Sequence, residues 1–275
     1  MMRTIWVLLL GLALFLGPGG EGWAAPGGPS LLEDLEYQVN LGVLQDMARV
    51  HLRLFQEDAG RYRAEVTGAA QGAWKVLNRW LPERYETEMA LEAGQLKPLV
   101  FREVFEAQGQ RISKEYRFDY SGEVLEAWRG VDGRGPVKEW QIPLREPVYD
   151  PFTLFYNIRL GALGPLKPGQ VLRVAAIPNP EPRQMIIDLG QKTEQGWKVM
   201  LTVKSKGGDD AYGPYFLLLT PQNVPQTAWM RALGFARLSG ELLNPGKIMK
   251  DGLPGAPQLS RQDETNGKPQ APAIP

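Results

Sequence analysis

The sequence predicts a mostly β, single-domain protein: a curved antiparallel sheet or barrel of about a dozen strands, with one or two short helices. Three observations lead to this fold class. Apolar and polar residues alternate with a period of two over many short runs, which is typical of strands buried on one face. Turn-forming residues separate these runs at short intervals. No helical pattern is long enough to serve as a repeated crossover, so we expect antiparallel rather than parallel pairing.

The first segment, residues 1–24, is typical of a cleavable signal peptide. Arg3 precedes an apolar run from Ile5 to Leu16, and small residues lead to Ala24. The competing interpretation is a retained membrane anchor, but about a dozen apolar residues are too few to cross the roughly 30 Å core of a bilayer as a helix. We therefore expect cleavage after Ala24, no transmembrane segment in the mature chain, and a soluble periplasmic protein.

Alternating runs fill the first half of the domain, which we expect to span residues 30–244. Polar residues separate the apolar ones, as Glu36 and Gln38 do on either side of Tyr37. Turn residues such as Ser121-Gly122 end the runs. Half-buried strands are predicted around five sets of apolar residues: Tyr37, Val39 and Leu41; Val50, Leu52 and Leu54; Tyr62, Ala64 and Val66; Tyr116, Phe118 and Tyr120; and Trp140, Ile142 and Leu144.

Two segments break the strand pattern and predict short helices. From Trp74 to Leu81 the apolar residues share one face of an amphipathic turn. At Asp150 a capping side chain precedes Pro151 at the first helical position, and aromatic residues follow at helical spacing. This second pattern predicts a helix of about ten residues that ends near Gly161.

Aromatic residues in these two segments are the candidate ligand-binding residues. Two interpretations stand side by side: they fill one end of the sheet as core, or they line a cavity for an apolar ligand. The residues concerned are Trp74, Trp80, Phe152, Phe155 and Tyr156.

The later segments are more continuously apolar, which predicts strands covered on both faces. They cover residues 171–177, 185–189, 197–204 and 215–220, and residues 236–243 add a final alternating strand. Residues 245–275 differ in kind, because Pro and Gly stand among polar residues without apolar periodicity. We expect this tail to be disordered. The alternatives are a recognition peptide or a tether to the cell wall.

The composition excludes several functions. The chain has no Cys and a single His, His51, so the residue types that carry most nucleophilic, metal and acid-base chemistry are scarce. Its 31 basic and 31 acidic residues are interspersed, which argues against a nucleic-acid partner. We therefore expect no catalytic residues, no metal site and no cofactor.

Few polar groups remain as chemical candidates. His51 lies on the polar face of its strand between Arg49 and Arg53, and we interpret it as a structural residue. Acidic pairs are the other candidates, as a glycosidase pair or a calcium site. We interpret them as charges in water on strand faces or in a turn: Glu86 with Glu88, Glu103 with Glu106, and Asp209 with Asp210.

An ordered set of short motifs resembles the bacterial exported family catalogued as domain of unknown function 3108. The motifs extend from about Leu35 to Leu243: Glu36-Tyr37-Gln38-Val39, Arg84-Tyr85-Glu86-Thr87, Tyr116-Arg117-Phe118-Asp119-Tyr120, Asp150 to Arg159, Leu166-Lys167-Pro168-Gly169, and Val224-Pro225 with Gly234. The resemblance implies a periplasmic or envelope protein with a mostly antiparallel β fold. The sequence departs from the family pattern at Pro178, Pro180 and Pro182, in a stretch expected to continue as a strand or hairpin.

Three function classes follow from these observations. The favoured class is a non-enzymatic module that binds or carries an apolar or lipid-like ligand, because a curved sheet can enclose a cavity. The alternative is a structural or assembly protein of the cell envelope that acts through protein-protein contacts. A carboxylate-based hydrolase is the third. A lined cavity favours the first, an exposed apolar patch the second, and convergent buried carboxylates the third.

Overall fold

The computed structural model describes residues 28–71, 82–107, 109–177, 183–204, 211–232, 236–249 and 253–254. The predicted signal peptide, the predicted turn with Trp74 and Trp80, Asp209-Asp210, and the tail beyond Pro254 lie outside the described residues. Within the described part, fifteen strands form one sheet, accompanied by a single helix, α1 (Pro151–Arg159). This helix, with nine residues, is neither long nor apolar enough to cross a membrane.

The strands are mostly longer than average strands, and the first half holds the longest of them. Their bounds are β1 (Ser30–Leu41), β2 (Leu44–Asp58), β3 (Arg61–Ala70), β4 (Pro82–Glu92), β5 (Gln95–Ala107), β6 (Gln110–Asp119), β7 (Val124–Val131), β8 (Val137–Pro143), β9 (Val148–Tyr149), β10 (Val171–Ala176), β11 (Arg183–Thr193), β12 (Gly196–Lys204), β13 (Ala211–Leu219), β14 (Pro225–Ala232) and β15 (Ala236–Lys247).

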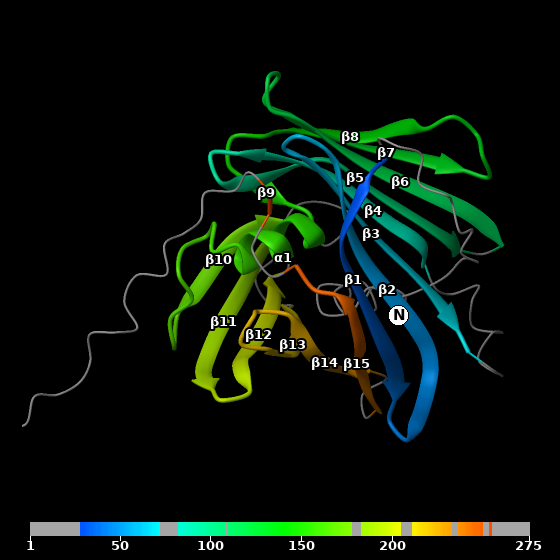
Figure 1. The fold of residues 1–275 in the computed structure, drawn as a ribbon. Helices are drawn as coiled ribbons and strands as arrows, with labels where there is room; N and C mark the ends of the chain where they lie inside the picture. The colour runs from blue at the N-terminus through cyan, green and yellow to red at the C-terminus, as the bar shows by residue number, and fades with distance from the viewer. Residues whose placement is uncertain are drawn as a thin grey trace, which may run out of the picture.

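Strand β1 lies in the middle of the sheet, between β2 and β15 (Figure 1). From β1 the chain adds one neighbour after another until it reaches β8 at one edge. It then continues to β9 at the opposite edge and returns strand by strand to β15. The sheet is therefore one continuous, curved layer whose first and last long strands pair with each other.

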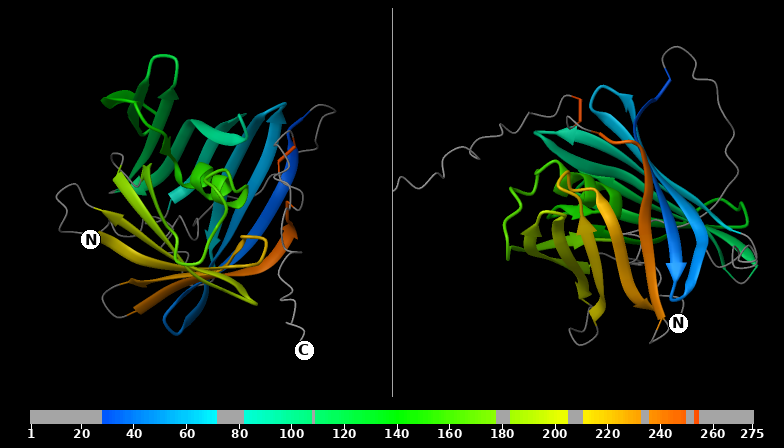
Figure 2. Two further views of the ribbon diagram at one scale, coloured as in Figure 1. Left: turned by 90° about the vertical axis from the view of Figure 1, so that its left-hand side faces the viewer. Right: turned by 60° about the horizontal axis from the view of Figure 1, so that its bottom comes forward.

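The sheet is curved and open, the first of the two forms that the sequence predicts. Its edges β8 and β9 are not paired with each other, yet residues 144–147 alone connect them. A link from Pro143 to Val148 spans at most about 18 Å of extended chain. The two edges therefore lie close together, and α1 follows directly inside the curl (Figure 2).

One pair of strands departs from the antiparallel prediction. Val148 and Tyr149 of β9 pair in parallel with Ala175 and Ala176 of β10, and α1 connects the two strands. The expectation of exclusively antiparallel pairing is wrong here. A strand of two residues has no readable periodicity, so the sequence pattern could not reveal this small β-α-β unit.

Alternation decides which residues enter the core. In β1 the inner residues Leu35, Tyr37 and Val39 are buried, and the same period continues across the neighbouring strands. The later strands follow it too: Lys198 and Lys204 on β12 are exposed while Val199 and Leu201 are buried. The prediction that these later strands are covered on both faces is wrong, because only the inner face is packed against α1 and the rest of the core.

The C-terminal boundary lies further along the chain than expected. Strand β15 continues to Lys247, beyond the predicted domain end at residue 244. Leu253 is buried in the core, and the Tyr62 hydroxyl donates a hydrogen bond to the Pro254 carbonyl at 2.5 Å. The predicted tail therefore includes residues that pack against the domain. Periodicity could not reveal them, because single apolar residues after a strand form no repeating pattern. Near the proline-rich departure, the hairpin of β10 and β11 is paired as far as Ala176 and Arg183.

Candidate functional site

Helix α1 lies inside the curl of the sheet and organises the candidate site (Figure 2). Asp150 caps its N-terminus, since one carboxylate oxygen accepts hydrogen bonds from the backbone of Phe152 at 2.9 Å and Thr153 at 3.1 Å. Pro151 occupies the first helical position. The helix predicted from this motif is confirmed, with its end at Arg159.

Polar side chains fasten α1 to the first half of the sheet. The Thr87 hydroxyl on β4 donates to Asp150 at 2.9 Å. Asn157 of α1 bonds the backbone of Leu96 on β5 twice: its Oδ1 accepts from the amide and its Nδ2 donates to the carbonyl, both at 2.8 Å. All of these groups are buried, so each bond is directional and shielded from water.

A buried ion pair joins the end of α1 to β1. The Arg159 guanidinium lies 2.5 Å from a Glu33 carboxylate oxygen, and their side chains are 3% and 0% exposed. Tyr156 donates to the same carboxylate at 3.2 Å, and the Met249 amide donates to its other oxygen at 3.2 Å. Burial alone lowers the pKa of Arg159, but attraction to Glu33, together with smaller effects of Tyr156 and Tyr37, outweighs burial and the pKa is raised. Arg159 therefore stays a cation that is already paired.

Phe152 belongs to an aromatic cluster on the inner face of β4 to β6. Its ring lies 6.5 Å from that of Tyr85 and 6.1 Å from that of Phe101. Phe101 in turn stacks on Tyr116 at 5.7 Å. Phe152 thus contributes to the core, as the first of the two interpretations describes.

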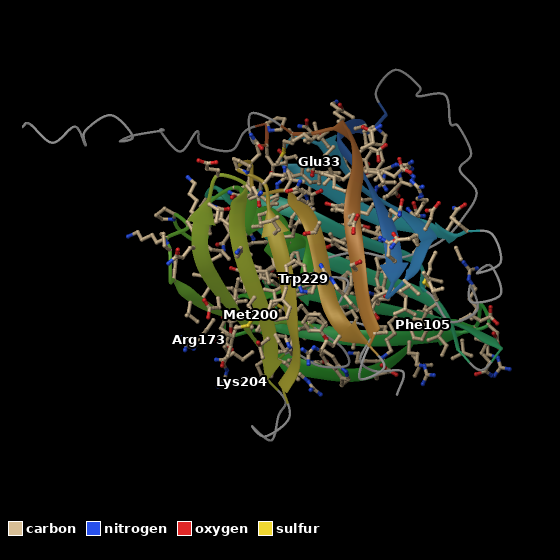
Figure 3. All side chains as sticks on the ribbon, turned by 90° about the horizontal axis from the view of Figure 1, so that it is seen from below. Glu33, Phe105, Arg173, Met200, Lys204 and Trp229 are labelled. Carbon is tan, nitrogen blue, oxygen red and sulfur yellow. The ribbon has the colours of Figure 1, made fainter. Side chains whose placement is uncertain are left out.

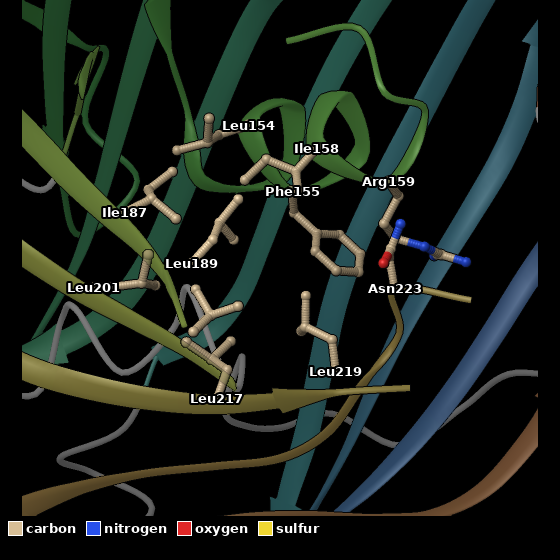
Figure 4. A pocket seen from close by; sticks show the side chains of 11 residues that line it. Leu154, Phe155, Ile158, Arg159, Ile187, Leu189, Leu201, Leu217, Leu219 and Asn223 are labelled. Atoms are coloured by element: carbon tan, nitrogen blue, oxygen red, sulfur yellow. The ribbon is translucent and has the colours of Figure 1, made fainter. Parts of the chain in front are cut away.

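On its opposite side α1 faces β11, β12 and β13 across an apolar pocket of about 40 Å³ (Figure 4). Phe155 and Ile158 extend into it from the helix. Aliphatic side chains of the sheet form the other wall: Ile187 and Leu189 from β11, Val199 and Leu201 from β12, and Leu217 and Leu219 from β13. We refer to this pocket and its two walls as the α1 seam.

Two polar residues line one end of the α1 seam. Arg159 and Asn223 both line the pocket, and Figure 4 draws them at the same end of it, beyond the hydrocarbon side chains. Asn223 lies in the turn between β13 and β14 with a φ of +60°, a conformation that Asn tolerates well. Arg159 Nε and Asn223 Oδ1 are both buried and have no hydrogen-bond partner among the described residues.

The five residues predicted from the sequence do not line one common pocket. Phe155 lines the seam, Phe152 packs in the aromatic cluster, and Tyr156 bonds Glu33. Trp74 and Trp80 lie outside the described residues.

Sequence reasoning missed Glu33, Arg159, Asn223 and the aliphatic wall. The sequence does contain a signal for the first two. Glu33 is two residues from Leu35 and therefore on the same face of the strand, and Arg159 is four residues from Phe155 and therefore on the same face of the helix. Periodicity thus places both charges on buried faces.

Glu103 corrects the interpretation of the acidic pairs as charges in water. It lies on the inner face of β5 beside the aromatic cluster and is 2% exposed. Burial raises its pKa to about 8, against a smaller opposing effect of Lys114. Glu106 is three residues further along the same strand and therefore faces the other side of the sheet. These two carboxylates therefore cannot act on one substrate as an acid-base pair.

Glu86 and Glu88 lie on the outer face, where both accept hydrogen bonds from Arg102. His51 is half-buried, with its Nδ1 3.4 Å from a carboxylate oxygen of Asp34. Among the described residues, no three His, Cys, Asp or Glu side chains are grouped so as to hold a metal ion.

The outer surface differs between the two halves of the sheet (Figure 3). On β3 to β6, oppositely charged side chains alternate across the strands, with Arg102 bonded to Glu86, Glu88 and Glu115. On β12 to β14, three apolar side chains are aligned in register instead: Met200, Phe216 and Trp229, which we call the outer apolar row. The rings of Phe216 and Trp229 stack at 5.5 Å.

Together, the fold and the seam define a class of protein: an open, curled antiparallel sheet that holds one helix against its inner face. Residues 36–189, more than half of the chain, match the family described as "Protein of unknown function (DUF3108)", and the chain belongs to this family. The family resemblance read from the sequence motifs is confirmed.

Two solved structures match this chain over most of its length. One is a β-barrel-like protein of domain of unknown function 1849 from Brucella abortus, with 9% identity over 79% of this chain and 98% of that chain, and a TM-score of 0.45. The other is a protein of the domain of unknown function 1089 family from Pseudomonas aeruginosa, with 16% identity over 77% and 94% of the two chains, and a TM-score of 0.25. No curated protein matches this chain.

Proposed function

We propose that this chain is an exported, non-enzymatic module of the periplasm or cell envelope that binds an apolar, lipid-like ligand in the α1 seam. One observation carries the proposal: nine of the eleven residues that line the pocket are apolar, and its two polar residues lie together at one end. Apolar pockets with a few placed polar groups are the usual form of small-molecule sites. The signal-like N-terminus of the sequence supports export.

The size of the pocket sets a condition on binding. A volume of about 40 Å³ is well below the roughly 150 Å³ of an apolar cavity that accepts benzene. A lipid-like ligand therefore enters only when α1 and the strands opposite it move apart. The proposal includes this separation of the two walls of the seam.

The attachments of α1 favour such a separation. The helix is bonded through polar groups to β1, β4 and β5, whereas the contacts across the seam are apolar among the described residues. Apolar contacts are non-directional, so a hydrocarbon ligand can replace them without leaving a polar group unpaired. The open edge adds freedom, because β9 and β10 pair over only two residues each.

A neutral fluorescent probe, N-phenyl-1-naphthylamine, tests the proposal on the mature chain. Leu217→Trp fills the seam from β13, while Leu218→Trp places the same ring on the outer face of the same strand. We expect saturable binding to the parent, a loss of about tenfold or more in affinity for Leu217→Trp, and an unchanged affinity for Leu218→Trp. Equal effects of the two variants, or no saturable binding to the parent, would rule out the seam as the site.

The outer apolar row favours a second candidate, a structural or assembly protein of the envelope that acts through protein-protein contacts. Its three side chains are partly exposed and adjoin one another, and adjoining apolar side chains at a surface often mark a contact surface. Cross-linking in intact cells distinguishes the two functions. If Trp229→Glu abolishes a cross-linked species that Leu217→Trp leaves intact, the outer surface and not the seam carries the function.

A further inference from the structure

We propose that the ligand of the α1 seam is a neutral amphiphile, a hydrocarbon chain that ends in a hydroxyl group bound between Arg159 and Asn223. This inference rests on the proposed function and names the chemical class of its ligand. It follows from three properties of the polar end of the seam: two hydrogen-bonding atoms that lack partners, their complementary polarity, and the charge balance around them.

The first property is the pair of atoms without partners. Arg159 Nε belongs to a side chain that is 3% exposed, and Asn223 Oδ1 is buried as well. Both residues line the same pocket, and Figure 4 draws them at the same end of it. Roughly 90% or more of buried polar groups have a hydrogen-bond partner, because leaving one unpaired costs free energy. Two such atoms at one end of an apolar pocket indicate a polar group of a ligand.

The polarity of these atoms defines that group. Arg159 Nε can only donate a hydrogen bond, and Asn223 Oδ1 can only accept one. A hydroxyl satisfies both with a single oxygen, because it accepts through a lone pair and donates its proton. A plain hydrocarbon satisfies neither. The geometry therefore favours an alcohol over an alkane of the same length.

Charge excludes the ionised head groups. Glu33 already neutralises Arg159, and both side chains are almost completely buried. A carboxylate head group would add an unbalanced negative charge in this apolar pocket, and an ammonium group an unbalanced positive one. A carboxylate would also place an acceptor against the acceptor of Asn223. A neutral head group meets neither penalty.

The turn that carries Asn223 allows a clean substitution. Two backbone hydrogen bonds hold this turn. The backbone N–H of Thr220 donates to the Val224 carbonyl at 2.7 Å, and the backbone N–H of Asn223 donates to the Thr220 carbonyl at 2.9 Å. Glycine adopts a φ of +60° without strain, so Asn223→Gly removes the side chain and keeps the turn. Gln222, an exposed neighbour in the same turn, provides the matched control Gln222→Gly.

The experiment measures how well twelve-carbon compounds displace N-phenyl-1-naphthylamine from the mature chain at pH 7.5. The compounds are 1-dodecanol, dodecanoate and dodecylammonium, which differ in the charge of their head groups. We expect 1-dodecanol to bind about tenfold or more tightly than either ion. Asn223→Gly should weaken 1-dodecanol binding about threefold to tenfold, with Gln222→Gly and the probe itself unaffected.

The outcomes separate this inference from the function on which it rests. If dodecanoate or dodecylammonium binds as well as 1-dodecanol, or if Asn223→Gly and Gln222→Gly behave alike, the hydroxyl site is wrong while binding in the seam stands. If the parent shows no saturable probe binding, the proposed function and this inference both fail.

Discussion

The two halves of the sheet treat the helix between them in opposite ways. Strands β1 to β5 hold α1 through a buried ion pair, buried hydrogen bonds, and tilted and edge-on contacts between aromatic rings. Strands β11 to β13 oppose it with aliphatic side chains and a small void. The chain leads from α1 to β10 in the second half of the sheet, yet the ion pair and hydrogen bonds of α1 are made with the first half. Proximity along the chain therefore does not decide which half of the sheet holds α1.

The outer faces repeat this difference. Charged pairs cover the half that fastens α1, whereas the outer apolar row lies on the half that opposes it. Exposed ion pairs contribute only about 0–1 kcal/mol each, so the charged face adds little to the stability of that half. One half of the sheet is therefore a scaffold for α1, and the other half provides the apolar side chains of the seam and of the outer apolar row. The following substitutions test this division.

Glu33→Gln should have the largest effect on stability. The substitution leaves the Arg159 charge buried without its partner, which typically costs about 3–5 kcal/mol. Urea denaturation of the parent and the variant measures the loss. Replacing both partners by Met should recover most of it, since a buried pair can be exchanged for apolar side chains. A loss below about 1 kcal/mol would contradict the ion pair as the attachment of α1.

Glu103→Gln should stabilise the scaffold half in a pH-dependent way. The pKa of Glu103 rises from an ordinary 4.5 to about 8 on folding, so the folded protein binds an extra proton between these values. The stability of the parent therefore falls as the pH rises through this window. The gain from Gln should grow by at most about 4 kcal/mol between pH 5 and pH 9. Thermal melts at both pH values measure it; an equal gain at each would show that Glu103 ionises normally.

Phe152→Ala and Phe155→Ala compare the two sides of α1 directly. Phe152 packs against Tyr85 and Phe101, and its removal should cost about 3 kcal/mol. Phe155 borders the seam and is only partly buried, so its loss should cost about 1–2 kcal/mol and should strengthen probe binding. Denaturant melts paired with probe titration give both values. The reverse order of costs would place the main attachment of α1 on the seam side.

Removal of the chain after Lys247 should cost about 2 kcal/mol, because Leu253 loses its place in the core. Tyr62 loses its hydrogen bond to the Pro254 carbonyl in the same truncation. A chain ending at Pro254 is the control, and its midpoint of thermal unfolding should match that of the parent. If both truncations behave like the parent, residues 248–254 do not contribute to the scaffold.

Arg84→Ala should have the smallest effect. Arg84 bonds Glu65 and Glu86 on the outer face, but about half of its side chain is exposed. We expect a change of about 0.5 kcal/mol or less that disappears in 1 M salt. Chemical denaturation at low and high salt measures it. A larger loss that persists in salt would mean that the charged face, and not the buried attachments, holds this half together.

The sequence predicted the elements whose cause is local. Period-two alternation identified β1, β2, β3, β6, β8 and β15, continuously apolar runs identified β10 to β13, and the Asp150-Pro151 motif located α1. It did not single out β4, β5, β7 or β14, whose runs mix charged and aromatic residues with less regular alternation. Of the candidate site it identified Phe155, but nothing local indicated the aliphatic wall opposite.

Alternation and capping depend on neighbouring residues, so the sequence alone is enough to predict an antiparallel β sheet with one capped helix. How that sheet uses its inner face depends on contacts between residues that are distant in the sequence. Glu33 and Arg159 meet across more than a hundred residues, and Glu103 is buried while Glu106 is not. Such contacts depend on strand order and on the curl of the whole sheet, which brings Asn223 to the end of α1 and leaves a seam beside Phe155.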